Sequence, residues 1–152
     1  MKTVRVTTEL GAPADVVWAA LKTPHAFVHV AGGMLRYPVA ERLDRPWRVG
    51  DRIRGWTFLF GFLPFSRHQL AIDAIDEEGL TVVSNERGGI VRRWCHWLEL
   101  TPTGERTCRY EDRVELDAGP LSGLVAAFAK VFYRHRQRRW RALARLLGAA
   151  SS

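Results

Sequence analysis

The stretch PLSGLVAAFAKVFYRHRQRRWRALARLL, residues 120–147, decides the fold. Pro120 suits the first turn of a helix, where its missing N–H removes no hydrogen bond, and Gly148 is placed to end that helix. At about 100° per residue, one face of the helix is apolar. This face consists of Leu121, Leu124, Val125, Phe128, Val131, Phe132, Ala142, Leu143 and Leu146. The sequence therefore predicts one long amphipathic helix that covers an apolar surface.

Two polar residues, His135 and Arg139, fall in the middle of that apolar face. Buried arginine is almost always paired, and Asp112, at an apolar position of the preceding strand, is the expected partner of either residue. Two interpretations remain open: a polar anchor for a ligand at one end of a pocket, or a salt bridge that fixes the helix to the sheet. The opposite face is expected to carry Lys130, Arg134, Gln137, Arg138, Arg141 and Arg145.

Length and composition indicate one globular domain, residues 1–152. The chain is 47% hydrophobic and 26% charged, which is not the composition of a disordered protein. No apolar run reaches the roughly 18 residues of a membrane span, and residues 1–5 lack the apolar core of a signal peptide. We expect a cytoplasmic protein.

The net charge of +7 is concentrated in the long helix. Seven positive charges and no acidic residue fall within residues 130–145. Cations near a helix C-terminus are stabilised by the helix dipole, so we interpret this segment as a solvated basic helix end. We do not expect nucleic acid as a partner, and a polyanion-binding module is the least favoured alternative.

The remainder of the chain alternates strand patterns with turn signals. Residues 3–10 form a strand pattern, Pro13 and Pro24 begin two short helices, and residues 37–44 form a weaker strand. Five further strand patterns follow, at residues 52–62, 67–75, 80–86, 91–101 and 106–116. The sequence predicts an α+β fold in β-α-α-β6-α order, with a curved antiparallel sheet of about seven strands wrapped around the long helix. Where the curved sheet does not close fully on the helix, the space between them forms a pocket.

Four motifs resemble one known superfamily. They are Ala12-Pro13-Ala14-Asp15-Val16-Val17-Trp18 followed by Thr23-Pro24; Trp94-Cys95-His96-Trp97; Glu111-Asp112-Arg113-Val114 followed by Gly119-Pro120-Leu121; and Phe132-Tyr133-Arg134-His135-Arg136. They resemble the START-like (SRPBCC) superfamily, which has the helix-grip fold and includes birch pollen allergen and polyketide cyclases. The resemblance covers essentially the whole chain. It implies an internal pocket for a hydrophobic small molecule, and members include cyclases, hydratases and lipid carriers.

His68 and His96 are the candidate catalytic residues. His68 shares a strand face with Leu70 and Ile72, and His96 shares one with Trp94, Leu98 and Leu100. Two imidazoles beside apolar walls suit general acid–base chemistry or hydrogen bonding to a neutral ligand. The loop between residues 101 and 106 decides whether His96 or Trp97 faces inward, because a shift of one residue reverses the face. The Leu98/Leu100 pattern favours His96.

Neither a metal nor a nucleotide cofactor is expected. His25 and His29 are four residues apart on a short helix, but no carboxylate is at a suitable spacing. The chain has no Cys-x-x-Cys, His-Glu-x-x-His, Gly-x-Gly-x-x-Gly or P-loop motif, and no serine in a Gly-x-Ser-x-Gly context.

The run Trp56-Thr57-Phe58-Leu59-Phe60-Gly61-Phe62-Leu63-Pro64-Phe65 is apolar on both faces of a strand. A half-buried strand would alternate. Its tip, residues 61–65, therefore caps the pocket mouth, packs on a second copy of the chain as a homodimer, or contacts an anionic membrane weakly together with the basic helix. The remaining interpretation is that the tip folds over the long helix as ordinary core.

These observations predict binding or transport of a small hydrophobic, aromatic or lipid-like molecule in an internal cavity. The alternative is a cyclase- or hydratase-type enzyme that acts on a polyketide-like or aromatic substrate, with an imidazole moving a proton. The expected apolar walls are Trp56, Phe58, Leu70, Trp94, Tyr110, Val114, Phe128 and Phe132. The expected polar contacts are His68, His96, Asp112, His135 and Arg139.

Overall fold

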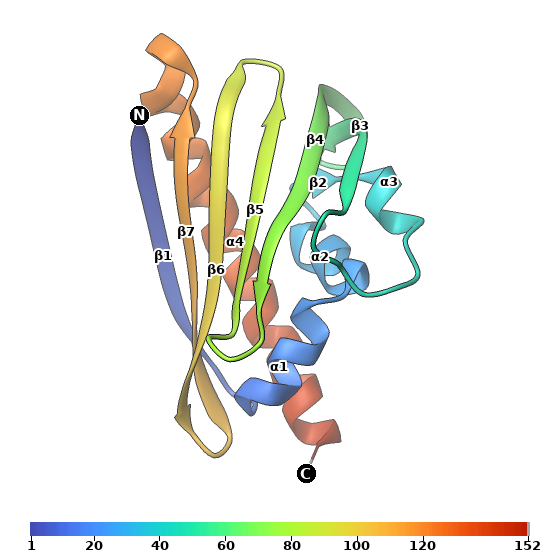
Figure 1. Ribbon diagram of the computed structural model, residues 1–152, viewed down its shortest axis with the longest axis vertical. Coiled ribbons are helices and arrows are strands. Elements are labelled where there is room, and N and C mark those ends of the chain that lie inside the picture. Colours follow the sequence, from blue (N-terminus) through green and yellow to red (C-terminus); the bar gives the residue numbers. More distant parts are fainter. Residues whose placement is uncertain (152) are drawn as a thin grey trace.

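The computed structural model describes residues 1–151 and shows a curved antiparallel sheet wrapped around one long helix (Figure 1). Within these residues the strand order is β1-β7-β6-β5-β4-β3-β2. The strands are β1 (Lys2–Leu10), β2 (Leu35–Arg36), β3 (Arg52–Leu59), β4 (Leu63–Asp76), β5 (Thr81–Gly88), β6 (Val91–Gly104) and β7 (Thr107–Asp117). The helices are α1 (Ala14–Leu21), α2 (Pro24–Ala31), α3 (Pro38–Glu41) and α4 (Ser122–Ala150). This is the predicted helix-grip architecture.

The long helix α4 crosses the concave face of the sheet, and α1 and α2 lie beside it (Figure 1). It packs mainly on β1, with further contacts to α2 and β7. The inward side of β7 alternates as predicted, with Cys108, Tyr110, Asp112, Val114 and Leu116 buried. None of the helices in the described part of the chain combines the length and apolar composition needed to cross a bilayer.

The predicted strand at residues 37–44 is wrong. The structure has only the two-residue strand β2 before this segment and the short helix α3 within it. Pro38 is the reason, because it lies in the first turn of α3, where a residue without an N–H loses no hydrogen bond. The helix start at Pro24 is confirmed, and α1 begins one residue after Pro13, which is its N-cap. The Thr23 side chain accepts a hydrogen bond from the Ala26 N–H of α2.

The buried face of α4 is rotated by about one residue, or about 100°, from the predicted one. Leu124, Val131 and Leu146 are exposed although the sequence pattern places them inward. Gln137, predicted on the solvent face, is 1% exposed. The stripe that packs on the sheet consists of Val125, Ala129, Phe132, Tyr133, Arg136, Gln137, Trp140, Ala144 and Gly148.

Gly148 does not end the helix, which continues to Ala150. A Cβ atom at this position would lie 2.6 Å from the Gly11 carbonyl oxygen. Glycine is therefore required here because the helix and the end of β1 approach each other closely.

The core has two main parts along α4. Trp140 packs at one end with Leu10, Val17, Leu98 and Tyr110. Phe132 and Tyr133 pack at the other end with Trp94, Val114 and Leu116. Several polar side chains are also buried, and three of them, Ser84, His96 and Arg136, line the inner end of the site described next.

Candidate functional site: an apolar cavity with a buried polar end

A cavity of about 560 Å³ lies between α2, α4 and the concave face of strands β2 to β6. Its walls are mainly aliphatic and aromatic, and they include Phe27, Leu35, Trp94, Phe128, Phe132 and Tyr133. The volume falls within the roughly 300–1,000 Å³ that is typical of small-molecule sites. The curved sheet and the helix thus leave room for a ligand instead of closing on each other.

Exposed apolar side chains mark the mouth of this cavity. Phe65, Ile90, Leu124 and Val131 line it although each is at least half exposed. Phe65 also contacts Phe128, with ring centroids 6.1 Å apart. Residues 61–65 are therefore not ordinary core, since Phe62 is 75% exposed. Phe65, the last residue of this tip, lies at the cavity mouth.

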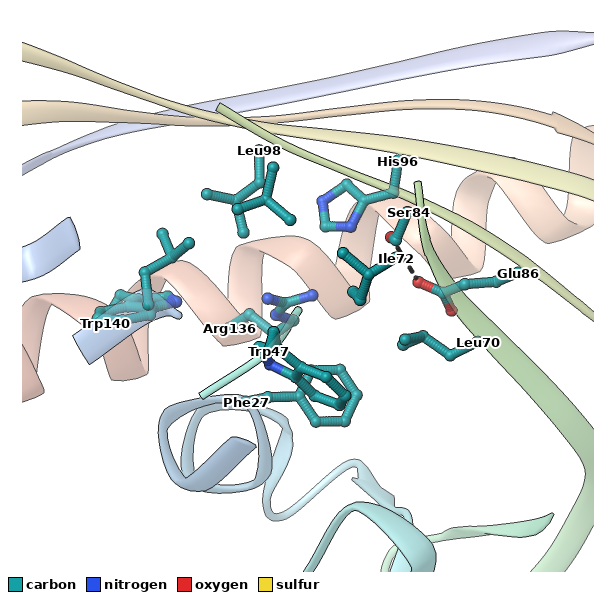
Figure 2. A pocket seen from close by; sticks show the side chains of 12 residues that line it. Phe27, Trp47, Leu70, Ile72, Ser84, Glu86, His96, Leu98, Arg136 and Trp140 are labelled. Carbon is teal, nitrogen blue, oxygen red and sulfur yellow. Dashed lines mark hydrogen bonds between the residues drawn. The ribbon is translucent and has the colours of Figure 1, made fainter. Parts of the chain in front are cut away.

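A smaller inner chamber of about 50 Å³ adjoins the main cavity. Phe27, Glu86 and Arg136 line both spaces. Figure 2 shows Arg136 reaching from α4 between Phe27 and Trp47 on one side and His96 and Leu98 on the other. The boundary between the two spaces is therefore polar and charged, whereas the main cavity is apolar.

Glu86 and His68 form a hydrogen-bonded pair at this boundary, with 2.8 Å between Glu86 Oε2 and His68 Nε2. Ser84 donates a longer hydrogen bond to the other carboxylate oxygen. Burial raises the pKa of Glu86, but the hydrogen bond from His68 and the charges of His68, His96 and Arg136 outweigh it, so the pKa lies below its usual range. Glu86 is a carboxylate that already has a partner.

Asp112 is the centre of a second buried network. It is 1% exposed and accepts hydrogen bonds from His96 at 2.8 Å, Tyr110 at 3.3 Å and Gln137 at 3.1 Å. Burial, followed by the nearby charge of Asp112, raises the pKa of Tyr110 well above its usual value, so the phenol keeps the proton that it donates. The prediction that Asp112 pairs with His135 or Arg139 is wrong.

His135 and Arg139 instead hold the C-terminal end of α2. His135 Nε2 donates to the Gly32 carbonyl at 2.7 Å, and Arg139 Nε donates to the His29 carbonyl at 2.8 Å. The last carbonyl groups of a helix lack the usual partners within it, and these two side chains bring donors to them from α4. The His29 carbonyl also accepts a longer bond from the Gly32 N–H at 3.3 Å. They fix α2 against α4 and line neither cavity.

Arg136 is the buried arginine of α4, and the sequence analysis did not single it out. It is 5% exposed, and it makes no hydrogen bond or ion pair with any residue in the range 1–151. Its guanidinium lies over the rings of Tyr133, Phe132 and Phe27, at 5.2, 5.8 and 5.9 Å from their centroids. A signal was available, because Arg136 continues the three- and four-residue spacing of Ala129, Trp140 and Ala144.

A family model described as a domain of unknown function (DUF8410) matches residues 8–144. The chain belongs to this family. The search of curated proteins gave no match. The shape of the DUF8410 chain is similar to that of several solved structures, all at low sequence identity.

Three of these structures show the range of proteins that share the fold. A truncated norcoclaurine synthase from Thalictrum flavum has a TM-score of 0.68 at 15% identity, over 93% of this chain and 92% of that one. A START superfamily protein from Mycobacterium smegmatis has a TM-score of 0.68 at 13% identity, over 95% and 98%. A putative protein of the dynemicin biosynthetic locus has a TM-score of 0.64 at 19% identity, over 93% of this chain and 46% of that one. The fold of this DUF8410 chain is thus the START-like helix-grip fold.

The structure brings part of the predicted site together. Trp94, Phe128, Phe132 and His68 line the main cavity, and Leu70 and His96 line the inner chamber. His96 faces inward as the Leu98/Leu100 pattern predicts. The β6–β7 hairpin has a bulge between Pro102 and Gly104, which places Asp112 opposite Leu98 in the DUF8410 sheet.

Other predicted wall residues lie outside both cavities. Tyr110 and Val114 are fully buried in the core, and Phe58 lines neither space. Trp56 is 50% exposed on the outer face of β3, and its neighbours Thr57 and Leu59 line the cavity instead. The Thr57 hydroxyl is satisfied there by a hydrogen bond to the Ser66 carbonyl at 3.1 Å.

His25 and His29 are exposed on α2. No cluster of three or more His, Cys, Asp or Glu side chains that could hold a metal ion occurs between residues 1 and 151.

Proposed function

We propose that this protein binds a small hydrophobic molecule in the main cavity, as a carrier or a sensor. The observation that carries the proposal is the cavity of about 560 Å³ with its apolar walls. Apolar walls around a space of this size have fewer packing contacts with one another than those of a collapsed core. An apolar ligand would recover that contact, and the exposed side chains at the mouth give it a path inward.

The comparisons support this proposal through the fold. Norcoclaurine synthase, which shares the fold, has been solved in complex with dopamine and hydroxybenzaldehyde. Its sequence identity to this chain is 16%, so the likeness concerns the fold and does not extend to these ligands.

A cavity-blocking variant tests the proposal. Ala31 is buried and lines the cavity, so Ala31→Trp places an indole in the space that the ligand would occupy. We expect the neutral fluorescent probe N-phenyl-1-naphthylamine to bind the wild type and to bind Ala31→Trp at least about tenfold more weakly. Fluorescence titration measures both affinities, and thermal melting verifies that the variant folds.

Ala142→Trp is the matched control, because Ala142 is exposed on α4 and lines neither cavity. Its probe affinity should equal that of the wild type. Leu35→Trp fills the cavity from another wall and should reproduce the effect of Ala31→Trp. Absence of probe binding to the wild type, or equal binding to all four proteins, would refute the proposed function.

An enzyme of the cyclase or hydratase type is the second candidate, and the His68–Glu86 pair in the cavity wall favours it. A carboxylate that accepts from Nε2 leaves Nδ1 of the imidazole as the proton acceptor, the arrangement of a general base. The enzyme would convert the molecule that occupies the cavity, and His68→Gln would stop conversion without changing probe affinity. Mass spectrometry of the incubated ligand distinguishes this candidate from a carrier.

A further inference from the structure

Arg136 is a buried positive charge without a hydrogen-bonded partner. Its side chain is 5% exposed, and Nε is fully buried with no acceptor. Burying a guanidinium without a partner is costly, and aromatic faces offset only part of that cost. Burial lowers the pKa of Arg136, yet attraction to Tyr110, Asp112, Tyr133 and Glu86 outweighs this and raises it, so the group stays charged.

The two carboxylates near Arg136 are already engaged. Glu86 is held by His68, and Asp112 accepts from His96, Tyr110 and Gln137. Neither lies within 4.0 Å of the guanidinium as an ion pair among residues 1–151. Arg136 therefore has N–H donors without an acceptor, whereas each carboxylate already accepts hydrogen bonds from other side chains.

The space next to Arg136 has the size of a ligand head group. The inner chamber measures about 50 Å³, enough for a few water molecules or one small polar group. Trp140, which packs against the Tyr110 ring, also lines it, and its buried indole N–H makes only a weak interaction with the Tyr110 side chain. Arg136 Nε and the Trp140 indole N–H are both donors, so the chamber suits a group that accepts hydrogen bonds.

We propose that the ligand is a hydrophobic monocarboxylic acid, with its apolar body in the main cavity and its carboxylate at Arg136. This inference rests on the proposed function. A carboxylate fits because its oxygens only accept hydrogen bonds. It also supplies a negative charge that would pair with the positive charge of the guanidinium. The shared wall of the two spaces, formed by Phe27, Glu86 and Arg136, is where the apolar body would meet the head group.

Displacement of N-phenyl-1-naphthylamine by ligands of equal chain length tests the inference. Dodecanoate, dodecanol, methyl dodecanoate and dodecylamine differ only at the head group. We expect dodecanoate to displace the probe from the wild type at a concentration about 10- to 100-fold lower than the alcohol, since hydrogen bonds to a charged group are the stronger ones. The ester should resemble the alcohol, and the amine should be the weakest.

Arg136→Met removes the charge and keeps most of the side-chain length. This variant should bind dodecanol as the wild type does, and its preference for dodecanoate should fall to about onefold. Arg138→Met is the matched control, because Arg138 is exposed on the same helix and lines neither cavity. It should keep the full preference, which separates a local contact from the effect of net charge.

Equal displacement by acid and alcohol in the wild type would overturn the inference even if Arg136→Met did not fold, and it would leave the proposed function intact. Preference for the acid that survives in a folded Arg136→Met would overturn it as well. Failure of the probe and of all four ligands to bind would instead refute the proposed function.

Discussion

Asp112→Asn is expected to lower the melting temperature by about 6–12 °C. This corresponds to about 3 kcal/mol, because removing one partner of a buried charged network costs a few kcal/mol, and 1 kcal/mol shifts a domain of this size by about 2–4 °C. Asp112 is 1% exposed and accepts from His96, Tyr110 and Gln137. Differential scanning calorimetry measures the change.

The geometry explains why asparagine is a poor substitute. Its amide N–H₂ would face a donor, for example Gln137 Nε2, which lies 3.1 Å from Asp112 Oδ2. Rotating the Gln137 amide would turn its oxygen toward the Val6 carbonyl, to which Gln137 now donates at 2.6 Å. One buried group therefore stays unsatisfied in either arrangement.

Asp44→Asn is the matched control, since Asp44 is exposed. Its free energy of unfolding should change by less than about 0.5 kcal/mol. Equal melting temperatures for Asp112→Asn and Asp44→Asn would show that the network around Asp112 does not stabilise the fold.

Trp140→Ala is expected to cost about 3–5 kcal/mol of the free energy of unfolding, as other large-to-small changes of buried tryptophan do. Trp140 is 1% exposed, and its ring lies 5.5 Å from the ring of Tyr110 between centroids. Removal of the indole leaves a void beside the inner chamber. Urea denaturation followed by circular dichroism measures the loss.

Leu146→Ala on the same helix should change the free energy of unfolding by less than about 0.5 kcal/mol, because Leu146 is 70% exposed. The sequence pattern predicts the opposite order, since it places Leu146 on the buried face and does not place Trp140 there. A larger loss for Leu146→Ala than for Trp140→Ala would refute the observed orientation of α4.

The misplaced face of α4 has a physical cause. Leu124 and Val131 are apolar because they line the exposed mouth of the cavity, whereas Val125 and Phe132 line the cavity and are also buried in the core beside it. Hydrophobic periodicity counts both sets as one face and centres it between them. A pattern of apolar residues cannot distinguish the wall of an open cavity from a packed core.

The strand β3 shows the same limit. Its second half, residues 56–59, has apolar side chains on both faces, so no alternation identifies the inner face there, and Thr57 faces inward while Trp56 faces outward. Where alternation is clear, as in β7, the sequence predicts the inner face correctly. Helix starts are also predictable, because proline and the Thr23 cap act through local chemistry.

Amino-acid composition alone could not show which of the several arginines of α4 is buried. What distinguishes Arg136 is its place in the stripe of small and aromatic residues that includes Ala129, Trp140 and Ala144. Small residues mark where a helix approaches its neighbours, and this stripe is a better guide to the buried face than the largest apolar side chains.

Mass spectrometry of an organic extract from the purified protein tests the central claim most directly. Wild type and Ala31→Trp are purified from the native host and extracted in parallel. We predict about one hydrophobic small molecule per wild-type chain and none from the blocked variant. The same extract from both proteins, whether empty or loaded, would contradict ligand binding in the cavity between the sheet and α4.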